Sequence, residues 1–292
     1  MEITQLIKEG TSVLKKHGVD NAEIDIQLLL GHILGMSRTQ LYLHGNTIPD
    51  PGSVSQFKQL LRRRAAREPV AYILSEQEFF SRSFFVSPDV LIPRPETEFL
   101  LEKVIEATSG NDLVIDHCLD LCCGSGIIAV ILALELDIDV LAIDCSAPAI
   151  EVTNRNIQAH DVQKLVTARV SDLFSVLEPG EHLFPLIVSN PPYVRKKDIV
   201  DLLEPEVARF EPKLALDGGD DGLRCIERIA NDILSFLSPG GMFFMEFGSD
   251  QGEAVRNIFT SVKVSDRYFT TIDIFKDYSS RDRVLFARAN FY

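Results

Sequence analysis

Residues 184–193 read FPLIVSNPPY, an apolar run that ends in a proline-rich turn. Such a run predicts a buried strand, so Asn190, Pro191, Pro192 and Tyr193 should follow its carboxyl end, the edge at which open α/β sheets bind ligands. Because two prolines fix φ and remove backbone donors, the turn presents acceptors beside a flat aromatic ring. That combination suits a planar amino group, although an ordinary strand-ending turn is an equally good interpretation of this segment alone.

A glycine-containing turn, Cys122 to Gly126, lies upstream between an apolar strand and an apolar helix over residues 127–136. Gly124 and Gly126 let the backbone approach a ligand closely at the N-terminus of that helix. The dinucleotide fingerprint G-x-G-x-x-G is not met, and the acidic Asp120 precedes the turn instead. Alone, such a turn more often marks a generic α/β connection than a cofactor site.

Acidic residues also follow the next two predicted strands. The strand over 140–143 ends at Asp144, whose carboxylate can accept both ribose hydroxyls of a nucleoside or can cap the following helix. The strand over 166–170 leads to Asp172 and Leu173, which can accept from an adenine amino group and cover its ring. In order with the two turns, these residues resemble the S-adenosylmethionine-dependent methyltransferase fold, in the branch that methylates planar amino groups of adenine, guanine and glutamine.

Composition bounds the class of protein. The 292 residues suffice for one large or two modest domains, and a hydrophobic content of 46% supports a sizeable core. No apolar stretch reaches the roughly 18 residues that span a bilayer, and no signal peptide is evident, so we expect a cytoplasmic protein. A formal net charge of −14 disfavours nucleic acid as a partner, and we interpret the basic residues 62–67 as the solvated end of a helix.

The cysteines do not predict a disulfide framework or a metal site. Their number is odd, at five, and they lie at positions 118, 122, 123, 145 and 225. The cluster at 117–123 lacks the second half of a paired zinc motif, so we expect no metal.

Periodicity divides the chain into three regions. Residues 1–73 show helical spacing without strand signals and predict a small helical bundle that positions a partner. Residues 74–95 predict a β-hairpin linker. Residues 96–292 alternate strand and helix, which predicts a mostly parallel sheet closed by an antiparallel pair over 268–275 and 283–287.

Local signals also set boundaries inside the third region. A helix beginning at Glu96 is either a plain proline-started helix or a lid over the cofactor pocket. Residues 223–237 predict a helix, residues 238–241 a turn, and residues 242–247 a fifth strand.

Several segments together resemble the PrmC/HemK family, the peptide chain release factor glutamine N5-methyltransferases, over nearly the whole chain. The IPRPETE motif at residues 92–98 is specific to this family, whereas the turn at 190–193 is shared with DNA and RNA amino-group methyltransferases. The other matching segments are residues 67–74, 120–126, 211–212, 215–219 and 281–284.

Three positions depart from the family pattern. Cys122 stands where glycine is usual, and we expect backbone contacts to survive if φ there is negative. Ser75 and Glu76 replace a usual glycine turn, and Phe247 stands before Gly248 where isoleucine is common. None of these changes removes a chemical group that the reaction needs.

The resemblance implies a seven-stranded, Rossmann-like, S-adenosylmethionine-dependent methyltransferase domain behind the helical bundle and hairpin. It implies methyl transfer to the glutamine of the Gly-Gly-Gln loop of class I release factors. Nothing in the sequence demands more than a monomer, and from the cysteine spacing and the net charge we expect no metal and no direct contact with nucleic acid. Carried over by position, the cofactor contacts are Asp120, Cys122, Cys123, Gly124, Ser125, Gly126, Asp144, Asp172, Leu173 and Asn190. Residues 190–193 would hold the substrate amide.

The chemical difficulty is the nucleophile, because an amide nitrogen has its lone pair delocalised into the carbonyl. Our hypothesis is that the side-chain oxygen of Asn190 and the carbonyl of Pro191 accept both amide N–H bonds and align the nitrogen with the S–CH3 bond. Tyr193 would pack against the glutamine side chain. No base is required before transfer, since the product cation is strongly acidic.

Three alternatives remain open from the sequence. A DNA or RNA amino-group methyltransferase would use the same turn, but the net charge disfavours it. A nicotinamide-dependent oxidoreductase is disfavoured by the incomplete glycine fingerprint. A catalytically silent binding module is disfavoured because the acidic and Asn-Pro-Pro-Tyr positions are intact.

Overall fold

The computed structural model describes residues 1–109 and 113–291. The chain divides into two compact units, each with its own hydrophobic core. The first unit is Met1–Glu76 with Glu204–Phe210, and the second is Gln77–Leu203 with Glu211–Tyr292.

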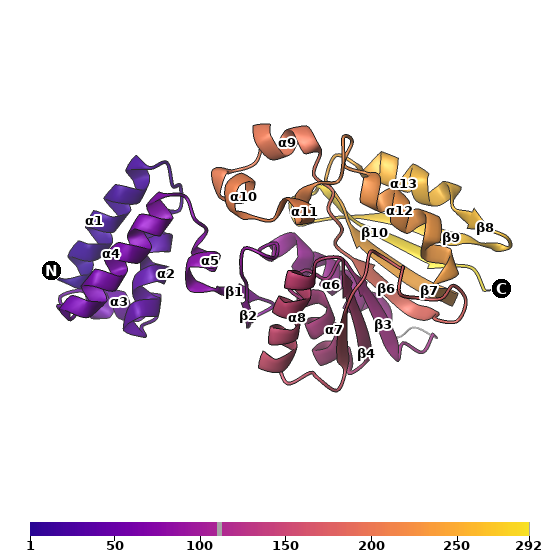
Figure 1. Ribbon diagram of the computed structural model, residues 1–292, viewed down its shortest axis with the longest axis horizontal. Helices are drawn as coiled ribbons and strands as arrows, with labels where there is room; N and C mark the ends of the chain where they lie inside the picture. Colours follow the sequence, from indigo (N-terminus) through magenta and orange to yellow (C-terminus); the bar gives the residue numbers. More distant parts are fainter. Residues whose placement is uncertain (110–112, 292) are drawn as a thin grey trace. The chain divides into compact units, whose positions relative to one another are not determined.

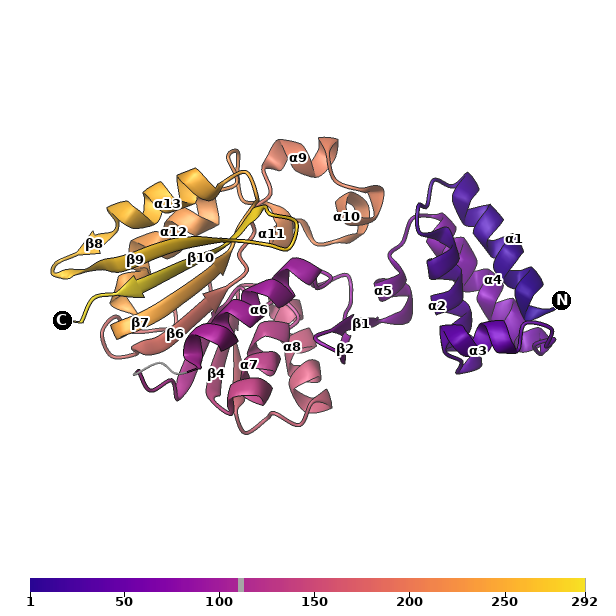
Figure 2. The same ribbon diagram turned by 180° about the vertical axis from the view of Figure 1, so that it is seen from behind.

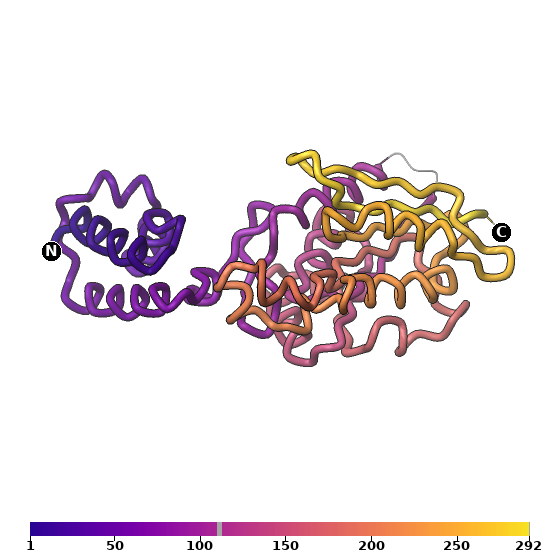
Figure 3. Tube along the Cα trace, turned by 90° about the horizontal axis from the view of Figure 1, so that it is seen from above, coloured from indigo at the N-terminus to yellow at the C-terminus, as the bar shows by residue number. Residues whose placement is uncertain are grey.

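The first unit consists of helices: those of residues 1–76 are the indigo to purple part of the chain, and the helix of residues 204–210 is drawn in orange (Figures 1 and 3). Amphipathic spacing buries Leu6, Ile26 and Phe57 in its centre. Its helices are α1 (Ile3–Lys16), α2 (Ala22–Leu34), α3 (Arg38–Leu43), α4 (Pro51–Ala65), α5 (Val70–Leu74) and α10 (Pro205–Phe210). The helical bundle expected at the N-terminus is therefore present, with one added helix from much later in the chain.

Glu206 of helix α10 explains why residues 204–210 join this unit. Its carboxylate pairs with Arg64 at 2.8 Å and with Arg67 at 2.5 Å. Arg64 also pairs with Asp25 of α2 at 2.6 Å, and only 8% of the Arg64 side chain is exposed. The sequence-based interpretation of residues 62–67 as a solvated helix end is therefore wrong for Arg64, because a distant carboxylate compensates its burial.

The expected hairpin is formed by β1 (Glu76–Phe79) and β2 (Arg82–Phe85). Phe80 and Ser81 both have positive φ, the geometry of a two-residue hairpin turn. Asn156 accepts from the Phe85 N–H at 2.8 Å and donates to the Phe85 and Ser125 carbonyls at 3.0 and 2.8 Å. One buried amide thus joins the hairpin to the glycine turn.

The second unit contains a mixed sheet of eight strands in the order β5-β4-β3-β6-β7-β10-β9-β8. The first five in that order are parallel, and β10 runs antiparallel between β7 and β9. The strands are β3 (His117–Leu121), β4 (Asp139–Asp144), β5 (Val166–Val170), β6 (Phe184–Ser189), β7 (Leu237–Glu246), β8 (Lys263–Val264), β9 (Arg267–Lys276) and β10 (Asp282–Ala289).

Two details of the sheet differ from expectation. The short β8 pairs with β9 and makes an eighth strand where seven were expected. The turn expected over 238–241 lies inside β7, beside an irregularity in its pairing with β6, and Gly240 there has a φ of +70°. Glycine in a strand marks a bulge as well as a turn, which local sequence does not distinguish.

Helices cover both faces of the sheet (Figures 1 and 2). One face packs on α6 (Pro95–Thr108), α7 (Ile127–Leu136) and α8 (Ala147–Ala159), and the other on α12 (Arg224–Asp232) and α13 (Gly252–Ser261). Burial on both faces explains why β6 is apolar throughout.

The remaining helical segments of this unit are short: α9 (Lys196–Asp201), α11 (Lys213–Leu216) and η1 (Ile233–Ser235). The helix expected over 223–237 thus ends at Asp232 and continues as a single 3-10 turn. Within the described residues, no helix is long and apolar enough to cross a bilayer.

Strand order reverses between β3 and β6, since β4 and β5 extend to one side and β6 and β7 to the other. In an open α/β sheet such a reversal leaves a crevice at the carboxyl ends of the strands. The glycine turn follows β3 and the Asn-Pro-Pro-Tyr turn follows β6, so both predicted motifs lie at this crevice.

Candidate active site

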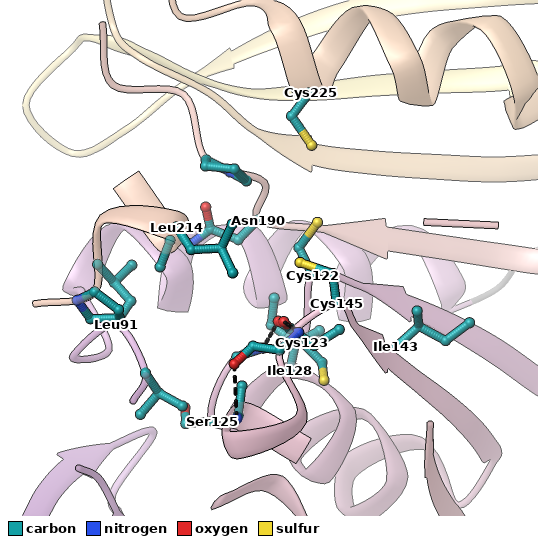
Figure 4. Close-up of a pocket in the computed structure, with 18 of the residues that line it drawn as sticks. Leu91, Cys122, Cys123, Ser125, Ile128, Ile143, Cys145, Asn190, Leu214 and Cys225 are labelled. Carbon is teal, nitrogen blue, oxygen red and sulfur yellow. Dashed lines mark hydrogen bonds between the residues drawn. The ribbon is translucent and has the colours of Figure 1, made fainter. Parts of the chain in front are cut away.

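A cavity lies at the carboxyl edge of the sheet in the second unit (Figure 4). Its walls come from the turns after β3, β4, β5 and β6, from residues 89–97, and from the start of α12. The predicted site residues that line it are Cys122, Cys123, Gly124, Ser125, Asp144, Asp172, Leu173, Asn190 and Pro192. Asp120, Gly126, Pro191 and Tyr193 do not line it.

The glycine turn is built from left-handed backbone. φ is +62° at Cys122, +54° at Gly124 and +78° at Gly126. Backbone contacts were expected to survive the change from glycine to Cys122 if φ there were negative, and this condition is not met. Cys122 instead holds a left-handed conformation that favours glycine. A Cβ added to Gly124 would meet nothing within 4 Å, whereas one added to Gly126 would lie 2.6 Å from a Thr153 methyl carbon. Gly124 thus leaves room for a ligand, and Gly126 permits helix packing.

Asp144 connects two of the predicted elements. One carboxylate oxygen accepts from the Gly124 N–H at 2.9 Å and the other from the Ser146 N–H at 2.8 Å. Burial raises the pKa of Asp144, and these hydrogen bonds oppose that rise. The cap of α8 is Ser146 rather than Asp144, so the carboxylate is held at the cavity wall by the backbone on both sides.

Asp120 lies beneath the glycine turn and is fully buried. One of its oxygens accepts from the Ala129 N–H in the first turns of α7 at 3.1 Å, while Oδ1 has no hydrogen-bond partner among the described residues. Burial raises the pKa of Asp120 well above its ordinary value. A buried carboxylate oxygen without a partner is uncommon and indicates a missing donor.

Asp172 and Leu173 occupy the position predicted for the adenine end. Leu173 is buried and lines the cavity, and its φ of +49° bends the chain after β5. The carboxylate of Asp172 accepts from Arg228 of α12 at 2.9 Å and is more than half exposed. It therefore retains accepting capacity toward the cavity.

Two thiols, those of Cys122 and Cys225, lie close together in the same wall. Cys122 and Cys225 share a hydrogen bond, and the sulfur of Cys225 points from α12 toward the turn that carries Cys122 (Figure 4). The bond from Cys122 lowers the pKa of Cys225 and raises that of Cys122. Within residues 1–109 and 113–291, no three His, Cys, Asp or Glu side chains come together in a group that could hold a metal ion.

The Asn-Pro-Pro-Tyr turn has two buried supports that the sequence did not identify. The Asn190 amide nitrogen donates to Thr97 at 3.1 Å, and the Thr97 hydroxyl donates to Glu246 at 2.8 Å. The Tyr193 hydroxyl donates to the second oxygen of Glu246, also at 2.8 Å. Two features could have pointed to these supports. Thr97 lies inside the IPRPETE motif, and Glu246 ends β7, the strand beside β6.

The segment before α6 forms another wall of the cavity. Leu91, Pro93 and Arg94 line it, with Thr97 from the first turn of the helix. Glu211 holds this segment by accepting from the Ile92 N–H at 3.1 Å and by pairing closely with Arg94. The segment is thus both a proline-started helix entry and a side of the cavity.

Comparisons with known proteins define the class first. The structure is similar to a methyltransferase from Pyrococcus furiosus, with TM-score 0.50 and 14% identity over 81% of this chain and 98% of that one. It is also similar to the catalytic domain of hMettl16, solved with an RNA hairpin, with TM-score 0.54 and 15% identity over 80% of this chain and 82% of that one. The fold is that of the S-adenosylmethionine-dependent methyltransferases, as expected.

Sequence comparison then gives the family. The family model named PrmC N-terminal domain matches residues 5–74, and the one named Methyltransferase small domain matches residues 95–219. A release factor glutamine methyltransferase of Clostridium botulinum is 35% identical over 99% of both chains. One of Geobacter sulfurreducens is 39% identical over 87% of this chain and 86% of its own. The chain belongs to the family of release factor glutamine methyltransferases, which confirms the predicted family.

Proposed function

We propose that this protein transfers the methyl group of S-adenosylmethionine to the side-chain amide nitrogen, N5, of the glutamine in the Gly-Gly-Gln loop of class I peptide chain release factors. The observation that carries the proposal is the Asn190 amide at the cavity wall, whose nitrogen is occupied by Thr97 so that its oxygen is available as an acceptor. Relatives named release factor glutamine methyltransferase match nearly the full length of the chain, which supports the proposal.

The cavity fits the proposed cofactor. Gly124 leaves open space where a Cβ would otherwise stand, and the Asp144 carboxylate bonded to its N–H lines the same cavity. Residues 122–126 would hold the methionine part, Asp144 the ribose hydroxyls, and Asp172 with Leu173 the adenine. When bound, S-adenosylmethionine supplies an electrophilic methyl group on a sulfonium sulfur.

The residues of the turn act on the substrate amide. The Asn190 oxygen and the Pro191 carbonyl would accept the two N–H bonds, which orients the nitrogen and stabilises the positive charge that develops on it. Burial raises the pKa of Tyr193 well above its ordinary value, so its hydroxyl stays neutral and keeps donating to Glu246. Tyr193 would therefore support the turn through its hydrogen bond to Glu246, and its ring would pack against the glutamine side chain.

Methyl transfer from labelled S-adenosylmethionine tests the proposal, with purified release factor, DNA and RNA offered separately. We expect label on the Gly-Gly-Gln glutamine, located by mass spectrometry, and its loss when that glutamine is replaced by alanine. Label on nucleic acid instead would leave the chemistry of the turn intact and overturn the substrate.

We further propose that residues 1–73 recognise the release factor, that residues 74–95 link them to the methyltransferase domain, and that a cytoplasmic monomer suffices. Hydrogen exchange of the full-length protein with and without release factor tests the first part. Added protection within residues 1–73 is the expected result, and protection confined to residues 96–292 would contradict it.

A further inference from the structure

A continuous chain of hydrogen bonds runs from the cavity wall into the sheet. It begins at the Asn190 amide, passes through the Thr97 hydroxyl, and ends on Glu246, which also accepts from Tyr193. Thr97 is 2% exposed and Glu246 is 1% exposed, so water does not compete for these groups. The parallel pairing of β6 with β7 places Ser189 beside Met245, and this register brings the next residues, Asn190 and Glu246, to the same edge.

The direction of each hydrogen bond follows from counting protons. A carboxylate only accepts, so Glu246 takes the single hydroxyl proton of Thr97. The Thr97 oxygen can then only accept from Asn190, which must turn its NH2 group toward Thr97. The Asn190 oxygen is left on the opposite side of the amide. Without this constraint, an asparagine amide presents either its oxygen or its NH2 group after a half-turn.

We propose that Thr97 and Glu246 are positioning residues that select the orientation of the Asn190 amide, so that its oxygen and not its NH2 group faces the substrate. This inference rests on the proposed function, in which Asn190 accepts from a planar amide NH2 group. In the reverse orientation two donor groups would oppose each other, and the nitrogen to be methylated would be repelled rather than held.

The selection depends on the charge of Glu246. If this carboxyl were protonated, it could donate to Thr97, whose own proton would then favour the reversed Asn190 amide. Burial raises the pKa of Glu246, and the hydrogen bonds from Thr97 and Tyr193 lower it. The positive charge of Arg283 on β10 also lowers this pKa, whereas the negative charge of Glu96 on α6 raises it. The correct orientation is therefore present above this raised pKa and is lost as the pH falls through it.

The matched variants are Thr97→Val and Thr97→Ser. Valine keeps the shape of threonine without the hydroxyl, whereas serine keeps the hydroxyl. We expect kcat/KM for the release factor to fall about tenfold in Thr97→Val, the factor that corresponds to one net hydrogen bond, and to recover in Thr97→Ser. A cooperative melting transition and measurable cofactor binding show that each variant is folded, although Thr97→Val should melt at a lower temperature because Glu246 loses a donor. Wild-type kcat/KM in Thr97→Val, or no recovery in a folded Thr97→Ser, would overturn the inference.

The pH profile supplies a readout that a purely structural role would not move. Wild-type kcat/KM should show an acid limb set by Glu246, while the profile of Glu246→Gln should be flat across that range, because glutamine has no charge to lose. An acid limb unchanged in Glu246→Gln would contradict the role of this carboxylate.

A measurement without turnover separates this inference from the proposed function. We expect the Asn190 side-chain amide protons, followed by 15N NMR without substrate, to exchange with water more slowly in wild type than in Thr97→Val. If wild type methylates no release factor but shows this difference, the substrate is wrong and the positioning holds. Equal exchange in both proteins would contradict the positioning itself.

Discussion

The glycine turn after β3 and the Asn-Pro-Pro-Tyr turn after β6 lie at neighbouring strand ends, yet they are built differently. Each has a buried acid behind it, Asp120 and Glu246 respectively. Asp120 accepts from a backbone N–H of α7, whereas Glu246 accepts from the Thr97 and Tyr193 hydroxyls. The first turn is therefore shaped by its backbone, with Cys122 held in a left-handed conformation, while the second turn depends on particular side chains.

The largest expected effect is on the side-chain-built turn. In the proposed function the Asn190 oxygen orients and stabilises the reacting nitrogen, so kcat should fall about 10²–10³-fold in Asn190→Ala, as is typical for the loss of an electrostatic stabiliser. Single-turnover methyl transfer measures this, with melting temperature as the control. A near-normal kcat would show that the turn binds the substrate without assisting the chemistry.

Within the backbone-built turn, two glycines should separate stability from ligand binding. Gly126→Ala should lower the free energy of unfolding by about 2–4 kcal/mol, because it combines a left-handed residue with overpacking against Thr153. Gly124→Ala has the same left-handed cost, about 1–2 kcal/mol, but open space around its methyl group, and should mainly weaken cofactor binding. Denaturant unfolding measures the free energy of unfolding of the two variants, and calorimetry measures their cofactor affinity. If both variants lost similar stability and similar affinity, the turn would respond as one unit.

Asp120→Asn tests whether the buried acid of the glycine turn serves the cofactor. The asparagine amide keeps an acceptor for the Ala129 N–H and removes a carboxyl group whose charged form is disfavoured by burial, which raises its pKa. The free energy of unfolding should therefore not fall. Cofactor affinity should drop about tenfold, since the unpaired oxygen becomes a donor. Unchanged affinity in calorimetry would restrict Asp120 to holding α7.

The smallest expected effect is at Cys122. Cys122→Gly relieves a left-handed cysteine but makes the unfolded chain more flexible, so the unfolding free energy should change by less than about 1 kcal/mol. Cofactor affinity should be unchanged, because the turn acts through its backbone. A large loss of affinity in Cys122→Gly would show that the thiol itself contacts the ligand.

Much of the fold was predictable because it depends on short-range patterns. Apolar runs and turn residues located β3, β4, β5 and β6, and helical spacing located α7 and the N-terminal bundle. The eighth strand escaped prediction because it has only two residues, and the bulge in β7 escaped because proline and glycine mark turns and bulges alike.

The residue types at the site could be predicted from the segments that follow each strand, because the carboxyl ends of parallel strands meet at one edge of the sheet. The positions of the acids, the glycine turn and the Asn-Pro-Pro-Tyr turn follow from the amino-acid order alone. Only the tertiary structure decided which groups support them: Thr97 reaches Glu246 across 149 positions, and Arg64 reaches Glu206 across 142. Such partners depend on strand register and helix packing, whose free energies come from contacts between distant segments and leave no local pattern.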